Sequence, residues 1–186
     1  MPLHYIDIAI AVVLPVTVYV LVRKGKAPAR AWPLFWIGCT IALSWELTFH
    51  FLGPEYSDNP LFSHVNPWPL APILQPLLHT LWDGGLFMAG YALCFLLLRA
   101  PRFRRFSVAE VFIMVAWGSL QALVVELIGS QSLWVYNPQT YNPVMFHFSG
   151  QPITLLPQLV WAVAPVLFYL ACLWMHGRDS GEPGGH

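Results

Sequence analysis

The chain has 186 residues, of which 57% are hydrophobic and 10% are charged, and its formal net charge is zero. Because a soluble domain carries roughly a quarter charged residues, this composition excludes an ordinary soluble domain. Without a basic excess there is no surface for nucleic acid, so we expect no nucleic-acid partner. The length predicts one domain.

Five stretches are long and apolar enough to cross a bilayer as helices, since the hydrocarbon core takes about 20 residues to span. We predict these helices at Ile6–Val22, Pro33–Leu52, Pro72–Leu98, Val108–Gly129 and Ile153–Met175. The leader MPLHYID carries no positive charge, and no small-residue cleavage site follows, so we interpret the first stretch as a retained helix. The expected fold is all-α, a polytopic membrane protein with five transmembrane helices in one bundle.

The bundle is expected to take up residues 1–176, and residues 177–186 are expected to form a disordered tail, because they are polar and glycine-rich. In a five-helix chain, every basic residue falls on one side. These residues are Arg23, Lys24, Lys26, Arg30, Arg99, Arg102, Arg104, Arg105 and Arg178. The positive-inside rule predicts that this side is cytoplasmic. The N-terminus would then lie outside or in the lumen, in a plasma (inner) membrane or the endoplasmic reticulum.

The two connections on the other side, residues 53–71 and 130–152, are long and contain Asn-Pro pairs, which mark turns. They are also rich in aromatic residues, namely Trp68, Trp134, Tyr136, Tyr141 and Phe146. Such residues form a belt at the membrane interface, which is the favoured interpretation, or else part of a lid over a cavity.

Three acidic residues, Glu46, Asp83 and Glu126, lie inside predicted spans. An ionisable group in a span is costly and is a functional hypothesis by default. Counting along the helices places all three in the middle-to-outer part of the membrane. His50 lies one helical turn after Glu46, and His79 lies one turn before Asp83, so each pair shares a helix face.

Further polar and aromatic residues extend these faces. Gln75 precedes His79 by one turn, Trp82 is next to Asp83, and Gln158 and Trp161 lie at the outer end of the fifth helix. Charged groups in lipid turn inward and pair, so we expect a polar patch inside an aromatic cavity. A carboxylate–imidazole pair suits proton transfer, and a tryptophan face stabilises a cation by about 0.5 to 2 kcal/mol.

The sequence therefore indicates a cavity fitted to protonating an alkene and sheltering the cation formed. The residues expected to be catalytic are Glu46, His79, Asp83 and Glu126. Those expected to bind substrate are His50, Gln75, Trp82, Gln158 and Trp161.

Simpler interpretations remain open for these residues. Either acid–histidine pair could be a helix-stabilising contact, and Glu126 could extend to the interface. The two pairs could also supply a zinc or iron site, but no HExxH is present, so we expect no metal and no cofactor. A serine hydrolase is disfavoured because there is no GxSxG. The three cysteines lie in apolar runs, and we expect no disulfide.

Four segments carry a resemblance to a known family. They are FWIGCTIALSWELTF with Glu46 and Phe49, HTLWDGGL, WGSLQALVVEL, and QLVWAVAPVLF with Gln158, Trp161 and Pro165. Together they resemble the emopamil-binding protein family, the EXPERA domain, which includes sterol isomerases and sigma-two-type ligand-binding proteins. The resemblance implies a five-helix membrane bundle that binds a sterol-like molecule or a hydrophobic amine. In the isomerases it also implies proton addition and removal around a carbocation, with Glu46, Trp161 and then Gln158 as the residues carried over.

The first hypothesis is therefore an intramembrane double-bond isomerase, or a protonation-initiated cyclase, acting on a sterol, terpenoid or related lipid. The second is a non-catalytic binder of a sterol, carotenoid or amphipathic amine, and the third is a structural subunit of a membrane complex. A transporter is disfavoured because no inverted repeat is visible. Expected partners are a hydrophobic small molecule and membrane lipids, and a homodimer is left open.

Overall fold

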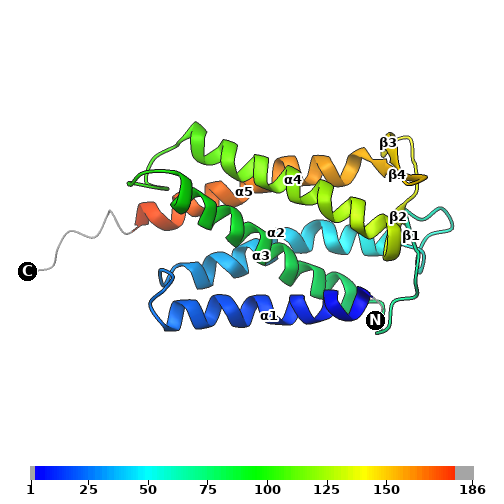
Figure 1. Ribbon diagram of the computed structural model, residues 1–186, viewed down its shortest axis with the longest axis horizontal. Coiled ribbons are helices and arrows are strands. Elements are labelled where there is room, and N and C mark those ends of the chain that lie inside the picture. The colour runs from blue at the N-terminus through cyan, green and yellow to red at the C-terminus, as the bar shows by residue number, and fades with distance from the viewer. Residues whose placement is uncertain (1–2, 179–186) are drawn as a thin grey trace, which may run out of the picture.

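Five long helices form one elongated bundle in the computed structural model, which describes residues 3–178 (Figure 1). They are α1 (Leu3–Arg23), α2 (Ala31–Phe51), α3 (Leu74–Leu97), α4 (Val108–Ser132) and α5 (Leu155–Arg178). Each is long and apolar enough to cross a membrane, because its sequence is an apolar run of about the length that a bilayer requires. For the described residues, the expectation of a mostly helical chain with five helices long and apolar enough to span a membrane is confirmed.

The last helix extends further than the sequence predicts. α5 continues through Arg178, so the first two residues of the expected tail are helical. Residues 179–186, the remainder of that expected tail, lie outside the described residues.

The two long connections contain short strands where the sequence predicts only loops. The strands are β1 (Phe62–His64), β2 (Trp134–Tyr136), β3 (Val144–Phe148) and β4 (Gln151–Thr154). β1 pairs antiparallel with β2, so that Phe62 lies opposite Tyr136 and His64 opposite Trp134. β3 and β4 form a second antiparallel pair. Because β1 and β2 come from different connections, their pairing joins these two connections into one cover.

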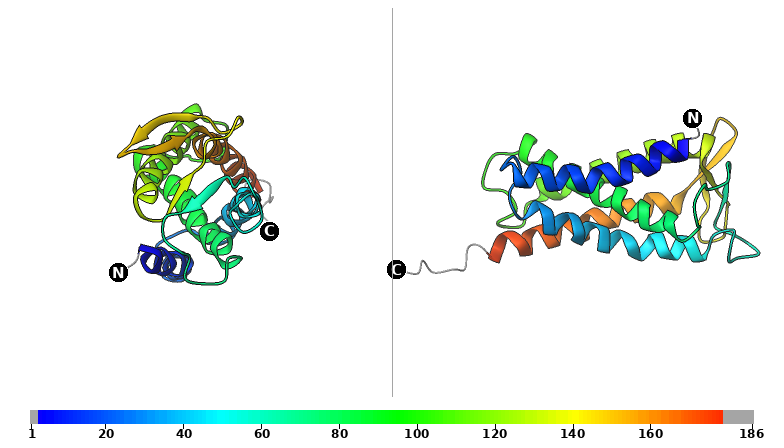
Figure 2. Two further views of the ribbon diagram at one scale, coloured as in Figure 1. Left: turned by 90° about the vertical axis from the view of Figure 1, so that its right-hand side faces the viewer. Right: turned by 90° about the horizontal axis from the view of Figure 1, so that it is seen from below.

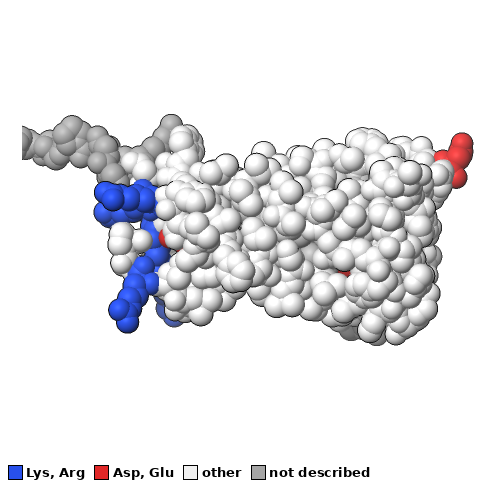
Figure 3. Space-filling view, turned by 90° about the horizontal axis from the view of Figure 1, so that it is seen from above, with Lys and Arg blue, Asp and Glu red and all other residues white. Residues whose placement is uncertain are grey.

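All four strands gather at one end of the bundle, as Figure 2 shows from two sides. We call this the strand end. The connections at the opposite end, residues 24–30 and 98–107, contain most of the basic residues, and Figure 3 shows Lys and Arg clustered there. We call this the basic end. The flank visible between the two ends in Figure 3 is almost free of charge, as expected of a surface that contacts lipid.

The helices approach one another closely where one of them has a glycine. At Gly84 in α3, an added Cβ would overlap the sulfur of Cys39 and lie 3.1 Å from Cε2 of Phe35, both in α2. At Gly118 in α4, an added Cβ would lie 2.9 Å from the backbone oxygen of Trp161 in α5. Small residues at such contacts are a common way to pack helices in a membrane, where van der Waals contact drives association.

α1 lies at the edge of the bundle in the end-on view of Figure 2. Of the residues in its most apolar 18-residue stretch, 6% are buried, compared with 39% in the corresponding stretches of α2 and α3. Its side chains are therefore mostly exposed along its length, and besides apolar packing such as that of Leu14 on Gly85 and Val18 near Phe35, it makes specific polar contacts at the strand end.

Candidate functional site

A cavity of about 380 Å³ lies in the half of the bundle nearest the strand end. All five helices contribute to its wall, and Phe62 of β1 and Trp134 and Tyr136 of β2 cover it. Its volume lies within the range of about 300 to 1,000 Å³ that is typical of small-molecule sites. The cover places aromatic rings over the cavity, so these three residues form a lid. Tyr141 and Phe146, which follow Trp134 and Tyr136 in the same connection, are exposed.

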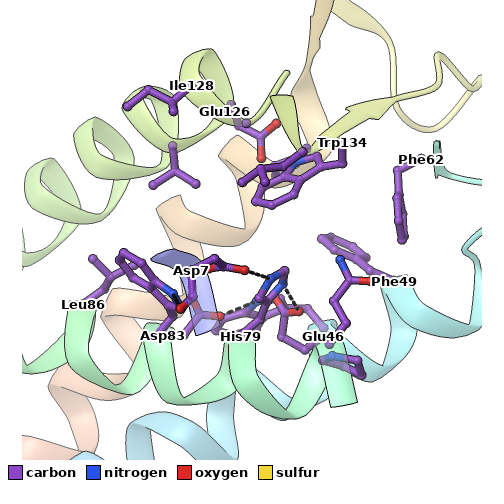
Figure 4. A pocket seen from close by; sticks show the side chains of 18 of the residues that line it. Asp7, Glu46, Phe49, Phe62, His79, Asp83, Leu86, Glu126, Ile128 and Trp134 are labelled. Carbon is purple, nitrogen blue, oxygen red and sulfur yellow. Dashed lines mark hydrogen bonds and ion pairs between the residues drawn. The ribbon is translucent and has the colours of Figure 1, made fainter. Parts of the chain in front are cut away.

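A single imidazole connects two carboxylates from different helices in this cavity. His79 of α3 has its Nε2 3.1 Å from Oδ2 of Asp7 in α1 and its Nδ1 3.4 Å from Oε2 of Glu46 in α2. Figure 4 shows the ring between the two carboxylates. We call these three residues the His79 cluster. A carboxylate only accepts hydrogen bonds, so both contacts are satisfied when the ring donates from both nitrogens, or when a carboxyl group holds one of the shared protons.

Asp83 lies one helical turn from His79 but has a different partner. The indole Nε1 of Trp45 in α2 donates to Oδ2 of Asp83 over 3.1 Å. The ring of Trp45 is 5.9 Å from the ring of Trp161 in α5, and both meet Phe87. Asp83 is therefore held at the edge of an aromatic cluster, and a charge next to it would lie against indole faces.

Glu126 of α4 faces the His79 cluster from the other side of the cavity, with Trp134 next to it (Figure 4). The Trp134 ring packs on Gly129, where an added Cβ would lie 3.0 Å from its Cζ2. Tyr136 completes this wall. Burial, and then the nearby carboxylate of Glu126, raise the pKa of Tyr136 well above its ordinary value, so its hydroxyl stays neutral and able to donate a hydrogen bond.

Eight of the nine residues predicted for the site line this cavity, and they are Glu46, His50, Gln75, His79, Trp82, Asp83, Glu126 and Trp161. Gln158 is not among the lining residues, although Pro157, Val160 and Trp161 are. The reason is rotation along α5. Each residue turns a helix by about 100°, which places Gln158 to the side of the face that its neighbours present to the cavity.

The predicted pairs along one helix are replaced by contacts between helices. His79 contacts Asp7 and Glu46 rather than Asp83. His50 lines the cavity, and its Nε2 is buried and has no hydrogen-bond partner among the described residues. Trp82 donates from Nε1 to the backbone oxygen of Asp7 over 3.0 Å. It therefore holds α1 in place at the point where Asp7 reaches His79.

Asp7 and Trp45 are the residues that sequence reasoning missed. A signal for Asp7 was present, since it lies in the first predicted helix at the end where the second helix finishes and the third begins. Trp45 had no such signal, because a tryptophan next to an acid in an apolar run has many ordinary roles.

The cavity is acidic and has an aliphatic rim. Its lining includes four carboxylic residues and no Lys or Arg. Among the described residues, no group of three His, Cys, Asp or Glu side chains is arranged to hold a metal ion. Two aliphatic lining residues, Ile6 of α1 and Ile128 of α4, are also 47% and 55% exposed at the surface, and we call them the aliphatic rim.

No protein-family model matches the chain, and no match was found among curated proteins or solved structures.

Proposed function

We propose that the chain is a membrane-embedded isomerase-type enzyme that protonates or moves a double bond in a sterol, terpenoid or related hydrophobic lipid through a carbocation. The observation that carries this proposal is the position of the His79 imidazole between Asp7 and Glu46, inside an aromatic cavity. The resemblance to the emopamil-binding proteins and their EXPERA domain is part of the proposal, and of the three residues that it carries over, Glu46 and Trp161 line the cavity and Gln158 does not.

The proposed reaction conserves the proton overall. Glu46 gives a proton to one carbon of the alkene, a C–H bond forms from the π electrons, and the other alkene carbon becomes a cation. Asp83 then removes a proton from a carbon next to the cation, and the electrons of that C–H bond form the new double bond. His79 lies one helical turn from Asp83 and contacts Glu46, so it can return the proton and leave the enzyme unchanged. General acid–base catalysis of this kind contributes about 10²- to 10⁴-fold to a rate.

The aromatic cluster supports the cationic step. Trp45, Trp161 and Phe87 lie within ring-contact distance of one another next to Asp83. A desolvated tryptophan face stabilises a cation by about 2 kcal/mol, and the carboxyl group of Glu126 faces the same space from the opposite wall. The substrate enters from the lipid past the aliphatic rim of Ile6 and Ile128, so it never has to cross water.

The orientation of the bundle follows from its charge. In this proposal the basic end is cytoplasmic by the positive-inside rule, and the strand end, with the N-terminus, is outside or lumenal. The C-terminus is then cytoplasmic, and the membrane is the plasma (inner) membrane or the endoplasmic reticulum. The cavity lies in the outer half of the bilayer.

The acidity of the cavity favours a second candidate, a non-catalytic receptor for an amphipathic amine or sterol-like ligand. Four carboxylic residues with no Lys or Arg among the lining residues would attract an ammonium group, and the aromatic walls would add cation–π contact. The two candidates share every residue of the site and differ only in whether a C–H bond is made and broken.

Incorporation of deuterium from solvent tests the proposal without knowledge of the substrate. The protein would be placed in nanodiscs made from the lipid extract of its own host membrane and incubated in D₂O, and the lipids would then be analysed by mass spectrometry. An isomerase adds deuterium to one alkene-containing lipid, because each protonation in D₂O delivers a deuteron to carbon. The Glu46→Gln variant should lose this incorporation by about 10²-fold or more.

Asp58→Asn is the matched control, because Asp58 is an exposed acid in the connection outside the cavity, and it should match the wild type. A retained lipid without deuterium above the level of protein-free nanodiscs would favour the receptor. If the Glu46→Gln variant incorporated deuterium as fully as the wild type, Glu46 would be excluded as the proton donor.

A further inference from the structure

A second cavity, of about 350 Å³, lies near the basic end between α1, α3 and the connection that follows α1. Val18 and Leu21 of α1 form one wall, and Tyr91 and Phe95 of α3 form the other. Lys26 and the turn after it close the end of the cavity nearest the loops. We call this feature the trough, and it shares no lining residue with the cavity of the proposed active site.

The trough has the dimensions of an acyl-chain site. Its α3 wall runs from Met88 to Leu96, which is about 12 Å at the rise of an α-helix. One leaflet of a bilayer core is about 15 Å thick, so the trough covers most of that depth. Ala92 and Leu96 on its edge are exposed, so the trough opens to the surroundings of the bundle.

The charge around the trough is strongly positive. The two connections at this end and the helix residues next to them contribute eight Lys and Arg residues, four from residues 23–30 and four from residues 99–105. The acid present there among the described residues is Glu110, which is buried and accepts a hydrogen bond from the backbone N–H of Phe103 over 2.7 Å. Lys26 itself is exposed at the end of the trough and can direct its three donors toward an anion.

We propose that the trough binds an anionic phospholipid, with one acyl chain between α1 and α3 and the phosphate on Lys26. An apolar groove that ends at a lysine matches both parts of such a lipid, and basic pockets between transmembrane helices are a common site for anionic headgroups. The lipid also bridges α1, the least buried helix, to α3 at the end opposite to Asp7. This proposal does not rest on the proposed enzymatic function.

Native mass spectrometry of the full chain with equal amounts of phosphatidylglycerol and phosphatidylcholine tests the proposal. The wild type should retain phosphatidylglycerol preferentially. A lysine near an anionic headgroup is worth about fivefold in binding, so Lys26→Gln should lower that retention by about this factor. Lys26→Arg keeps the charge and should keep the retention. Arg105→Gln is the matched control, because it removes an exposed positive charge at the same end that does not line the trough.

The acyl-chain part has its own test. Ala92→Trp fills the trough from its exposed edge without altering charge, and it should lower retention of phosphatidylglycerol as much as Lys26→Gln does. Glycerol phosphate, which has the headgroup without the chains, should not displace the lipid. Equal retention of the two lipids by the wild type, an equal loss in Arg105→Gln, or full retention in Ala92→Trp would each overturn the proposal.

Discussion

The Nε2 atom of His79 lies 3.1 Å from Oδ2 of Asp7, which joins α3 to α1 across 72 positions of the chain. α1 has few other polar anchors. Trp82 donates to the backbone oxygen of Asp7, and Nε2 of His4 lies 3.1 Å from the backbone oxygen of Asn66. The same contact that completes the proposed proton-transfer site therefore holds the least buried helix against the bundle.

Asp7→Asn should strongly reduce activity without unfolding the protein. The asparagine side chain keeps an oxygen that can accept a hydrogen bond from His79, so α1 stays in place, but it can neither carry the negative charge nor take up a proton. We expect deuterium incorporation to fall by about 10²-fold, with little change in the melting temperature. In a double variant with Glu46→Gln the losses should not add, because Asp7 acts through His79 on the return of the proton to Glu46, a step that Glu46→Gln already removes. Incorporation at the wild-type rate in Asp7→Asn would remove this residue from the mechanism.

Gly129→Ala should loosen the lid over the cavity. The added Cβ would come within 3.0 Å of Cζ2 of Trp134, and the ring cannot move freely because β2 is paired with β1. Overpacking of this kind costs about 1 to 3 kcal/mol, so the melting temperature should fall. Gly177→Ala is the control, because nothing lies within 4 Å of its added Cβ. Trp134→Phe in the Gly129→Ala background should recover stability, since the smaller ring relieves the contact, and no recovery would contradict this explanation.

The pairing of β1 with β2 should weaken as the pH falls. Burial lowers the pKa of His64 from its ordinary value of 6.5, despite the attraction of Glu55 at 3.4 Å, and His4 and His79 nearby act in the same direction as burial. Below pH 6.5, the His64 imidazole therefore binds a proton more readily when β1 is separated from β2 than when the two strands are paired. The pairing is fully stable above that pH and loses stability as the pH is lowered through it.

Hydrogen exchange of the Val65 amide, which donates to the backbone oxygen of Leu133 over 2.9 Å, measures this effect. After correction for intrinsic rates, its protection should be lower at about pH 5 than at about pH 7.5. His64→Asn should remove the dependence, whereas His147→Asn, an exposed histidine on β3, should keep it. An unchanged dependence in His64→Asn would assign it to another group.

Trp161→Phe should slow the chemical step more than it weakens binding. The phenyl ring keeps most of the apolar contact with Phe87 but is a weaker partner for a cation. A loss of about 0.5 to 2 kcal/mol corresponds to about 2- to 30-fold in rate. Deuterium incorporation under saturating lipid measures the step, and the lipid concentration for half-saturation measures binding. Trp36→Phe, at an exposed tryptophan outside the cavity, should alter neither, and equal effects of the two substitutions would argue against a cation at Trp161.

The helices were predictable because each is a single apolar run, and no predicted end differs from the observed end by more than three residues. The strands were not, because β1 and β2 are short and acquire their partner from a segment about 70 residues away. No periodicity within either connection signals that pairing. Asn-Pro turns favour an extended backbone before each proline, which allows such a pairing without specifying it.

The site was predictable as a set of residues but not as a set of contacts. Residue types and depth along the helices identified most of the lining, since an ionisable side chain in a span turns inward. Which carboxylate meets which imidazole depends on helix rotation and on how α1 packs, and a single sequence does not contain that information. The rotation of α5, which takes Gln158 away from the cavity, is likewise not specified by a single sequence.

Nitrogen-15 NMR of His79 in bilayers tests most directly whether one imidazole is shared by two carboxylates, which is the claim on which the proposed proton transfer depends. With labelled histidine, a His79→Gln sample assigns the two ring resonances. The structure predicts that Asp7→Asn shifts mainly the Nε2 resonance and that Glu46→Gln shifts mainly the Nδ1 resonance, while Asp58→Asn shifts neither. Ring resonances that stay in place in both cavity variants would contradict the account.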